Sequence, residues 1–339
     1  MKYYLQKRIL GEILSKSEAQ EALSIIGKGE ANNSQIASFL TTYMIKSITA
    51  EELEGFRDAM LDLALTVDLS EFSPMDVCGT GGDGKDTFNI STTSSFVVAG
   101  AGQRVAKHGN HGVSSSVGSS TVLEYLGVKF TNDESSLKAK IEDAGICFLH
   151  APLFHPAMRF VGPIRKELGM KTFFNMLGPI LNPARVKKQV TGVYNQEILG
   201  IYGELFSKQT PLSIGEETGV RLNFGVLFGL DGYDEISLTS DFELITQKGK
   251  ETFSPEQLGF TKCKQEDLHG GNNVEESAKI LISILENQGT KAQTEVVMAN
   301  AAIALYCADD DLSLSDAVLM AKESLISGKA LNSFKKFVE

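Results

Sequence analysis

Residues 76–126 read DVCGTGGDGKDTFNISTTSSFVVAGAGQRVAKHGNHGVSSSVGSSTVLEYL, a segment that combines glycines, hydroxyl side chains and a few cations. Between Thr87 and Leu123 there is no Asp or Glu, although the chain contains 43 acidic residues. The basic and imidazole side chains in this acid-free interval are Arg104, Lys107, His108 and His111. A buried unit of small residues would also exclude carboxylates, but burial alone does not explain three separate clusters of Gly, Ser and Asn. The segment therefore indicates a surface that holds phosphate.

Predicted strands and helices alternate along and beyond this segment. Residues 75–78 and 104–106 are expected to be short strands, and they end at the polar clusters 79–84 and 107–110. Further elements are expected as helices at 96–101 (capped by Asn89 or Ser91), 119–126 and 134–144 and a strand at 146–150. This alternation predicts an α/β fold with a mainly parallel central sheet flanked by helices. Ligands of such sheets bind beyond the carboxyl ends of the strands, so the clusters should converge on one crevice.

The second half of the chain continues the α/β pattern. Strand-type runs occupy residues 189–194 and 225–230, residues 235–238 alternate like a strand, and residues 242–253 resemble a hairpin around Gly249. Three helices are expected to finish the chain, at 274–286, 294–306 and 313–327. The polar segment 211–223 is expected to be an irregular loop.

The first 66 residues show helical spacing instead. Ser17 with Gln20 and Thr49 with Glu52 have the spacing of capping boxes, which mark helix starts. Residues 155–184 return to a helical pattern punctuated by Pro and Gly, and we expect them to rejoin this bundle. The expected division is a small all-helical domain at 1–70, completed by 160–184, and a larger α/β domain at 71–159 and 185–339.

Composition limits the possible functions. A chain of 339 residues with 42% hydrophobic content can bury a large core. A net charge of −11 argues against a nucleic-acid-binding surface, which needs clustered Lys and Arg. The sequence has no signal-peptide-like run and no membrane-spanning run, and its four cysteines show no CxxC spacing, so we expect a cytoplasmic protein with reduced thiols.

The glycine cluster at 79–84 matches two common fingerprints only superficially. Its GxGxxG spacing is that of dinucleotide-binding loops, but those need an acidic residue about 20 positions later, where this chain has none. Its P-loop spacing fails because Asp86 stands where Ser or Thr must meet magnesium. The remaining prediction is general: backbone N–H groups of a glycine loop and a helix N-terminus approach an anion. Asp234 and Glu235 directly follow the strand at 225–230, and such a carboxylate pair suits Mg²⁺ held together with substrate phosphates.

Taken together, these motifs resemble the anthranilate phosphoribosyltransferases, a family that shares its fold with pyrimidine nucleoside phosphorylases. The matching segments, in order, are GTGGD at 79–83, NIST at 89–92, KHGN at 107–110, VSSSVGS at 113–119, HPAM at 155–158, RKELG at 165–169, FNMLGP at 174–179 and DGYDE at 231–235. They run through nearly the whole chain. The resemblance implies transfer of phosphoribosyl from 5-phosphoribosyl 1-diphosphate to the amine of anthranilate, the second step of tryptophan synthesis from chorismate. It also implies a homodimer formed through the helical domain, with no nucleic-acid or membrane partner.

The resemblance assigns roles to residues of three groups. The phosphoribosyl donor would be held by Gly79, Gly82, Asp83, Thr87, Asn89, Ser91, Thr92, Lys107 and Ser119. Anthranilate would be held by Gly79, His108, Asn110, His155, Arg165 and Gly178. Two Mg²⁺ ions per active site would be bound by Ser91, Asp234 and Glu235. No covalent nucleophile or strong base is implied, because the amine attacks as the bond to pyrophosphate breaks, and catalysis is then mainly positioning and charge stabilisation.

The chain departs from the family pattern at several positions. His111 stands where Arg is common, Ser116 where Lys or Arg is common, Thr121 where an acid is expected and Phe228 where His is frequent. Two alternatives remain open at this point. One is a pyrimidine nucleoside phosphorylase of the same fold, which needs no metal at the acidic pair. The other is a non-catalytic relative that binds nucleic acid, which the charge of −11 disfavours.

Overall fold

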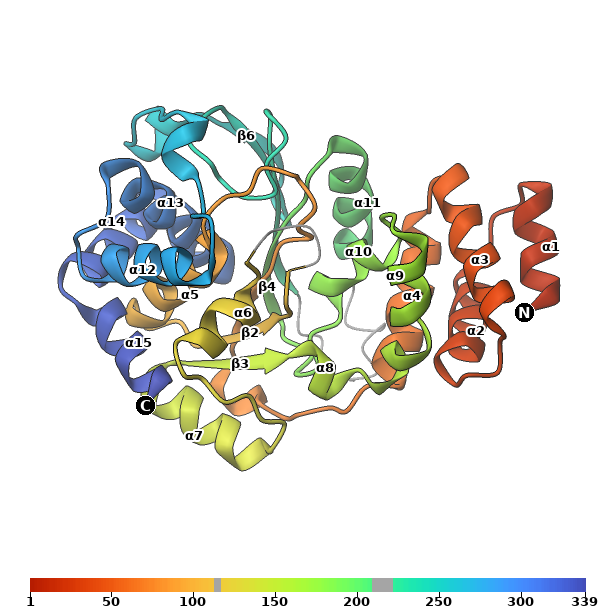
Figure 1. Cartoon of the computed structure of the whole chain (residues 1–339). Coiled ribbons are helices and arrows are strands. Elements are labelled where there is room, and N and C mark those ends of the chain that lie inside the picture. The colour runs from red at the N-terminus through yellow and green to blue at the C-terminus, as the bar shows by residue number, and fades with distance from the viewer. Residues whose placement is uncertain (113–116, 209–221) are drawn as a thin grey trace.

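The computed structural model describes residues 1–112, 117–208 and 222–339. A helical unit at the N-terminal side adjoins a larger α/β unit that contains the C-terminus (Figure 1). The expectations for Ser116 and for residues 211–221 of the anticipated loop lie outside the described residues. In the described part of the chain, none of the helices is long and apolar enough to cross a membrane.

The centre of the α/β unit is a sheet, which has seven strands in the described ranges, in the order β3-β2-β1-β4-β5-β6-β7. Its strands are β1 (Met75–Val77), β2 (Val105–Gly109), β3 (Ile146–His150), β4 (Lys188–Gly192), β5 (Asn223–Gly229), β6 (Phe242–Thr246) and β7 (Gly249–Phe253). The first five run parallel, and β6 and β7 form an antiparallel hairpin at the edge. This confirms the predicted α/β class with a mainly parallel sheet.

Helices cover both faces of this sheet, because its strands are apolar on both faces. On β5, Leu227 packs into one apolar cluster, whereas Phe224, Val226 and Phe228 pack into another. The first cluster is covered by α5 and by the blue C-terminal helices of Figure 1. Their bounds are α5 (Ile90–Gly100), α12 (Val274–Leu285), α13 (Lys291–Ala308), α14 (Leu314–Ile326) and α15 (Lys329–Val338). Two further helices, α6 (Ser119–Tyr125) and α7 (Glu134–Ala144), lie beside β2 and β3.

The second cluster joins the helical unit to the sheet. It contains apolar side chains of the N-terminal helices, of residues 157–181, and of α11 (Gln196–Ser207) together with β5. The N-terminal helices are α1 (Lys2–Leu10), α2 (Lys16–Gly27), α3 (Asn33–Ile45) and α4 (Ala50–Asp62). Between β3 and β4 the chain forms the short helices α8 (Ala151–Phe154), α9 (Gly162–Leu168) and α10 (Phe174–Leu177), with 3-10 turns η2 (Pro156–Phe160) and η3 (Gly178–Ile180). The exact domain boundaries stay a prediction.

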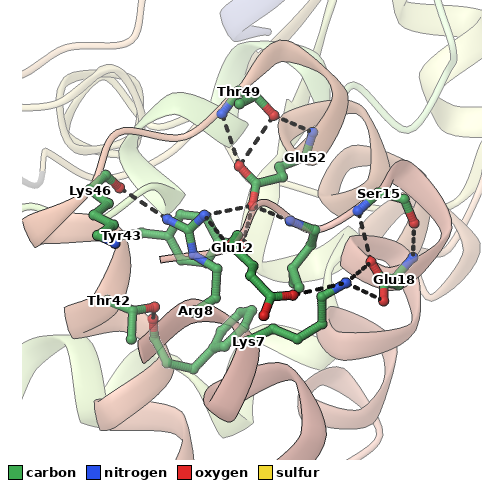
Figure 2. Close-up of polar contacts among 12 residues, drawn as sticks. Lys7, Arg8, Glu12, Ser15, Glu18, Thr42, Tyr43, Lys46, Thr49 and Glu52 are labelled. Atoms are coloured by element: carbon green, nitrogen blue, oxygen red, sulfur yellow. Dashed lines mark hydrogen bonds and ion pairs between the residues drawn. The ribbon is translucent and has the colours of Figure 1, made fainter. Parts of the chain in front are cut away.

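A buried ion pair holds α1 against α3 and α4 (Figure 2). Arg8 Nη1 donates to Glu52 Oε1 at 3.0 Å, and the Tyr43 hydroxyl donates to the same oxygen at 2.9 Å. The other Glu52 oxygen accepts the backbone N–H of Thr49 at 3.0 Å, which completes the predicted capping box of α4. Arg8 Nη2 donates to the carbonyl of Lys46 at 3.2 Å. This network fixes the end of α3 beside the end of α1.

Several predicted elements differ from the structure. The cap of α2 is Ser15, paired with Glu18, and not Ser17 with Gln20. β2 runs through Lys107, His108 and Gly109 because these residues pair with β3, so the cluster lies in the strand and not after it. Residues 235–238 form no strand: the Asn300 side chain bonds both the N–H and the carbonyl of Ile236, and Leu238 has φ 58°. A fourth helix, α15, follows the three expected at the end of the chain, and α11 was also not predicted.

Candidate active site

A cavity of about 590 Å³ lies where the carboxyl ends of β1 and β2 face the segment 151–181. All the residues predicted for the site line it: Gly79, Gly82, Asp83, Thr87, Asn89, Ser91, Thr92, Lys107, His108, Asn110, Ser119, His155, Arg165, Gly178, Asp234 and Glu235. They come from the glycine loop after β1, the start of α5, β2, the start of α6, the short helices and the turn after β5. The topology thus brings together clusters that are as much as 156 positions apart in sequence, from Gly79 to Glu235.

The glycine loop approaches the acidic turn closely. Gly81 donates its N–H to Asp234 Oδ2 at 2.6 Å. A Cβ atom at Gly79 would lie 2.7 Å from the same carboxylate oxygen, so a larger residue there would displace the Asp234 carboxylate. Gly82 has φ 85°, a conformation that favours glycine. The loop therefore needs glycine at these positions to lie against the carboxylate.

The start of α5 and Lys107 form the phosphate-type side of the cavity. Ser91 and Thr92 lie in the first turn of α5, where the helix dipole favours negative charge. Asn89 precedes the helix, and its side chain donates to the carbonyl of Val117 at 3.1 Å. Lys107 is only 2% exposed, and its ammonium donates to the Val77 carbonyl and to Ser91 Oγ. A buried cation at a helix N-terminus is a strong anion-binding arrangement.

Asp234 and Glu235 add two carboxyl groups to this side, and Glu235 accepts from Ser91, the residue that Lys107 also contacts. Burial raises the pKa of Glu235 to about 7, although Ser91 N–H donates to its Oε1 at 2.8 Å. Burial also raises the pKa of Asp234 well above its ordinary value, and the carboxylates of Glu235 and Asp83 add to the effect. Carboxylates crowded in this way are stabilised by a cation, so the donor set fits Mg²⁺. Within the described ranges no group of three or more His, Cys, Asp or Glu side chains could hold a metal ion.

The other side of the cavity is apolar, with neutral imidazoles and the partly buried guanidinium of Arg165. His108 and His155 meet edge to face with ring centroids 5.2 Å apart, and His108 Nδ1 lies 3.0 Å from the carbonyl of Gly178. Burial lowers the pKa of His108 to about 3 and that of His155 to about 4, so both rings are neutral at pH 7. Arg165 lies over the ring of Phe174 at 5.3 Å, and its Nη2 donates to Asn175 Oδ1 at 3.3 Å. This side suits a small aromatic anion.

Other residues that line the cavity were not predicted, among them Met158, Arg159, Phe174 and Asn175. Asn175 and Phe174 belong to the FNMLGP segment, so that motif was the available signal. Arg159 follows HPAM directly, is exposed, and lies over the ring of Phe160 at 4.6 Å. No local pattern distinguishes it from an ordinary surface arginine.

The departures from the family pattern have separate environments. His111 lines the cavity, and its Nδ1 lies 3.3 Å from the hydroxyl of Thr121, so two of the departures contact each other. Phe228 is buried in the cluster between β5 and the helical unit, away from the residues that line the cavity.

Comparison with known proteins agrees with this geometry. The model described as "Glycosyl transferase family, a/b domain" matches residues 72–331, and "Glycosyl transferase family, helical bundle domain" matches residues 2–64. Fold and site therefore define a two-domain glycosyl transferase.

The relatives narrow this class. Proteins named anthranilate phosphoribosyltransferase from Cytophaga hutchinsonii and Christiangramia forsetii are 50% identical over 339 residues and 51% identical over 336 residues. These matches cover 100% of both chains in the first case, and 99% of this chain and 98% of the relative in the second. The Thermus thermophilus enzyme structure is 34% identical with a TM-score of 0.88, and covers 98% of both chains. The Saccharomyces cerevisiae enzyme in complex with PRPP and Mg is 28% identical with a TM-score of 0.86, over 99% of this chain and 96% of that one. The chain belongs to the anthranilate phosphoribosyltransferase family.

Proposed function

We propose that the chain transfers the phosphoribosyl group of 5-phosphoribosyl 1-diphosphate to the amine of anthranilate, giving N-(5-phosphoribosyl)anthranilate and pyrophosphate. The observation that carries this proposal is the division of one cavity into a phosphate-type side around Lys107 and an apolar side around Arg165. Relatives of this name at about 50% identity over their full length support it. The product would serve tryptophan synthesis as its second step from chorismate.

On the donor side, the residues that would hold the diphosphate, ribose and 5-phosphate are Gly79, Gly82, Asp83, Thr87, Asn89, Ser91, Thr92, Lys107 and Ser119. Backbone N–H groups, hydroxyls and one buried ammonium are the donors that phosphate oxygens need. We also propose two Mg²⁺ ions per site, held by Ser91, Asp234 and Glu235. Asp234 is hydrogen-bonded to the glycine loop and Glu235 to the start of α5, so each faces a different part of the donor. Bound Mg²⁺ would neutralise the charge of the departing pyrophosphate.

On the acceptor side, Arg165 would pair with the anthranilate carboxylate, and Gly79, His108, Asn110, His155 and Gly178 would enclose the ring and the amine. Neutral His108 and His155 can accept or donate a hydrogen bond but carry no charge that repels the forming oxocarbenium-like state. The amine attacks the ribose carbon as its bond to pyrophosphate breaks, so catalysis consists of positioning and charge stabilisation. No covalent nucleophile is required.

The function can be tested by following the consumption of anthranilate through its fluorescence. Anthranilate and 5-phosphoribosyl 1-diphosphate with MgCl₂ should give a loss of fluorescence that stops when EDTA is added. The pyrimidine nucleoside phosphorylase alternative predicts instead that uridine or thymidine is cleaved by inorganic phosphate without Mg²⁺. Turnover with neither pair of substrates would contradict both enzymatic functions.

We propose further that the chain forms a homodimer through the helical unit. Leu10 at the end of α1, Ile13 in the connection that follows it and Ile45 at the end of α3 are 76%, 58% and 77% exposed. The bond from Arg8 to Lys46 holds the ends of α1 and α3 together (Figure 2). Exposed aliphatic side chains gathered at one place are typical of an interface between chains. We also propose the domain division 1–70 with 160–184 against 71–159 with 185–339, which the shared apolar cluster of α1–α4 and residues 157–181 supports. The four cysteines, all free thiols, support a cytoplasmic location.

Ile45→Glu should shift the chain to monomers in sedimentation velocity without loss of helical signal in circular dichroism, because a charge on an apolar interface must be desolvated. Leu319→Glu is the matched control, since Leu319 on α14 is 62% exposed and lies on the α/β unit. An unchanged sedimentation coefficient for Ile45→Glu, or a monomeric unmodified chain, would contradict the proposed interface.

A further inference from the structure

Residues 178–182 connect the acceptor side of the cavity to the sheet. Among the described residues, side chains from three adjacent strands hold this segment: His108 of β2 contacts the Gly178 carbonyl, Gln189 of β4 donates to the Pro179 carbonyl, and Asp76 of β1 accepts from Asn182. The segment begins three residues after Asn175, which receives the hydrogen bond from Arg165. Its position therefore determines where the acceptor side lies relative to the strands.

The contact between Asp76 and Asn182 is the part of this arrangement that the reaction as described above does not use. Asn182 Nδ2 donates to Asp76 Oδ2 and to the Ala106 carbonyl, both at 2.9 Å, and its Oδ1 accepts the N–H of Ala184 at 2.9 Å. The other Asp76 oxygen accepts the N–H of His108 at 3.1 Å. Asp76 is 0% exposed and Asn182 is 4% exposed, so water does not compete for these bonds. One carboxylate thus bridges the backbone of β2 at His108 and the 178–182 segment.

Burying a carboxylate between two strands costs desolvation free energy. Burial raises the pKa of Asp76 to about 6, even though the Lys107 ammonium and hydrogen bonds from Asn182 and His108 oppose the effect. Apolar packing would hold β1 against β2 at a lower cost in desolvation. What the carboxylate adds is direction: its two oxygens accept from two different chain segments at fixed geometry.

The two segments that Asp76 joins carry groups from opposite sides of the cavity. Lys107 and His108 are adjacent on β2, and Gly178 lies four residues before Asn182. We propose that Asp76 and Asn182 are positioning residues, whose hydrogen bond sets the distance between the acceptor side and the donor side of the cavity. This proposal depends on the phosphoribosyl transfer proposed above. Transfer between two bound substrates depends steeply on the placement of the reacting atoms, so loosening the bond should weaken productive binding of the acceptor.

The first variant is Asn182→Ala. It removes the side-chain bonds to Asp76, Ala106 and Ala184. The KM for anthranilate should rise about tenfold, the lower end of the range for losing a buried hydrogen bond to a charged group, while the KM for the phosphoribosyl donor changes less than about twofold. Asp76→Asn should raise the anthranilate KM similarly, because a carboxamide has one acceptor oxygen where the carboxylate has two, and can therefore accept from His108 N–H or from Asn182 but not from both. The double variant should show no more than the larger of the two single effects, since each single change already breaks the bridge between β2 and the 178–182 segment.

Asn300→Ala is the matched control. Asn300 is also buried and bonds the backbone at Ile236 and Val296, but it holds the turn after the acidic pair. It should lower the melting temperature comparably without selectively raising the anthranilate KM. If Asn182→Ala does not fold, Asn182→Ser can replace it, since serine keeps one hydrogen-bond donor. The same comparison then applies, between the change in KM for anthranilate and the change in KM for the phosphoribosyl donor. Equal factors on both KM values, or multiplying effects in the double variant, would overturn the positioning role. Absence of turnover by the unmodified chain would instead overturn the proposed function.

Discussion

Glu235→Gln should lower kcat/KM for the phosphoribosyl donor by about 100- to 1,000-fold, the loss typical of removing one group that stabilises transition-state charge. The reason is local. Gln can still accept the Ser91 N–H that Glu235 Oε1 accepts at 2.8 Å, so the turn should keep its shape while the site loses a negative ligand for Mg²⁺. Steady-state assays over a range of MgCl₂ should show a higher Mg²⁺ requirement in the variant.

The same substitution should not destabilise the fold. Because the folded-state pKa of Glu235 is raised from its ordinary 4.5 to about 7, the folded chain holds a proton that the unfolded chain has lost between these values. Stability of the unmodified chain in EDTA should therefore fall as pH rises from about 4.5 to 7 through this group. Glu235→Gln has no proton to lose at this position. The difference between its melting temperature and that of the unmodified chain should therefore shift in favour of the variant as pH rises through this interval.

Glu243→Gln serves as the control, since Glu243 on β6 pairs with Lys250 at 2.9 Å and does not line the cavity. It should change neither activity nor the Mg²⁺ requirement by more than about twofold, as expected for a partly exposed ion pair outside the cavity. A Glu235→Gln enzyme with normal activity at low MgCl₂ would exclude Glu235 as a metal ligand. Low activity together with a large loss of stability would mean that the carboxylate is structural.

Local sequence signals predicted the first and last residues of some elements correctly. The helix at 134–144 and the strand at 146–150 agree with α7 and β3, because Gly145 with φ 79° separates them clearly. Residues 235–238 had the alternation of a strand, but bonds from Asn300, 64 positions from Ile236, replaced the ladder bonds that a strand would need. A tertiary side chain decided the conformation there, and no window of local sequence contains it.

The candidate site was predictable to a similar degree. Motifs at the ends of predicted strands identified the glycine loop, the KHGN segment and the acidic pair, since parallel strands place their carboxyl ends at one edge. His155, Arg165 and Gly178 lie outside these strand ends, and only the family resemblance pointed to them. The lone Arg159 carried no such signal. Nor did the pairing of Asp76 with Asn182, which are 106 positions apart and meet only because Asn182 lies against β1 at Asp76 and β2 at Ala106. Sequence patterns therefore indicate which chemistry gathers at a strand end, whereas pairings between distant segments require the folded chain.

Arg165→Ala should raise the KM for anthranilate by about 10- to 150-fold, the range expected when a hydrogen-bonded charge pair worth about 1.5–3 kcal/mol is lost. Arg165 is partly buried between Phe174 and Asn175, and burial lowers the pKa of its guanidinium from its ordinary value, yet it stays charged at neutral pH. In this partly desolvated place its attraction for a carboxylate is stronger than at the surface. The KM for the phosphoribosyl donor should change little, because the donor contacts lie on the other side of the cavity.

The sharpest comparison uses the two arginines that line the same cavity. Arg159→Ala removes an equal charge from an exposed position, and should raise the anthranilate KM less than about threefold because solvent screens that guanidinium. Arg165→Lys should recover only part of the affinity, since an ammonium cannot bind a carboxylate through two parallel bonds. Turnover of aniline would test the carboxylate contact directly. Because aniline lacks the carboxylate, it should be as poor a substrate for the unmodified enzyme as for Arg165→Ala. Equal losses of donor and acceptor affinity in Arg165→Ala would show that the residue maintains the cavity as a whole and does not bind the carboxylate.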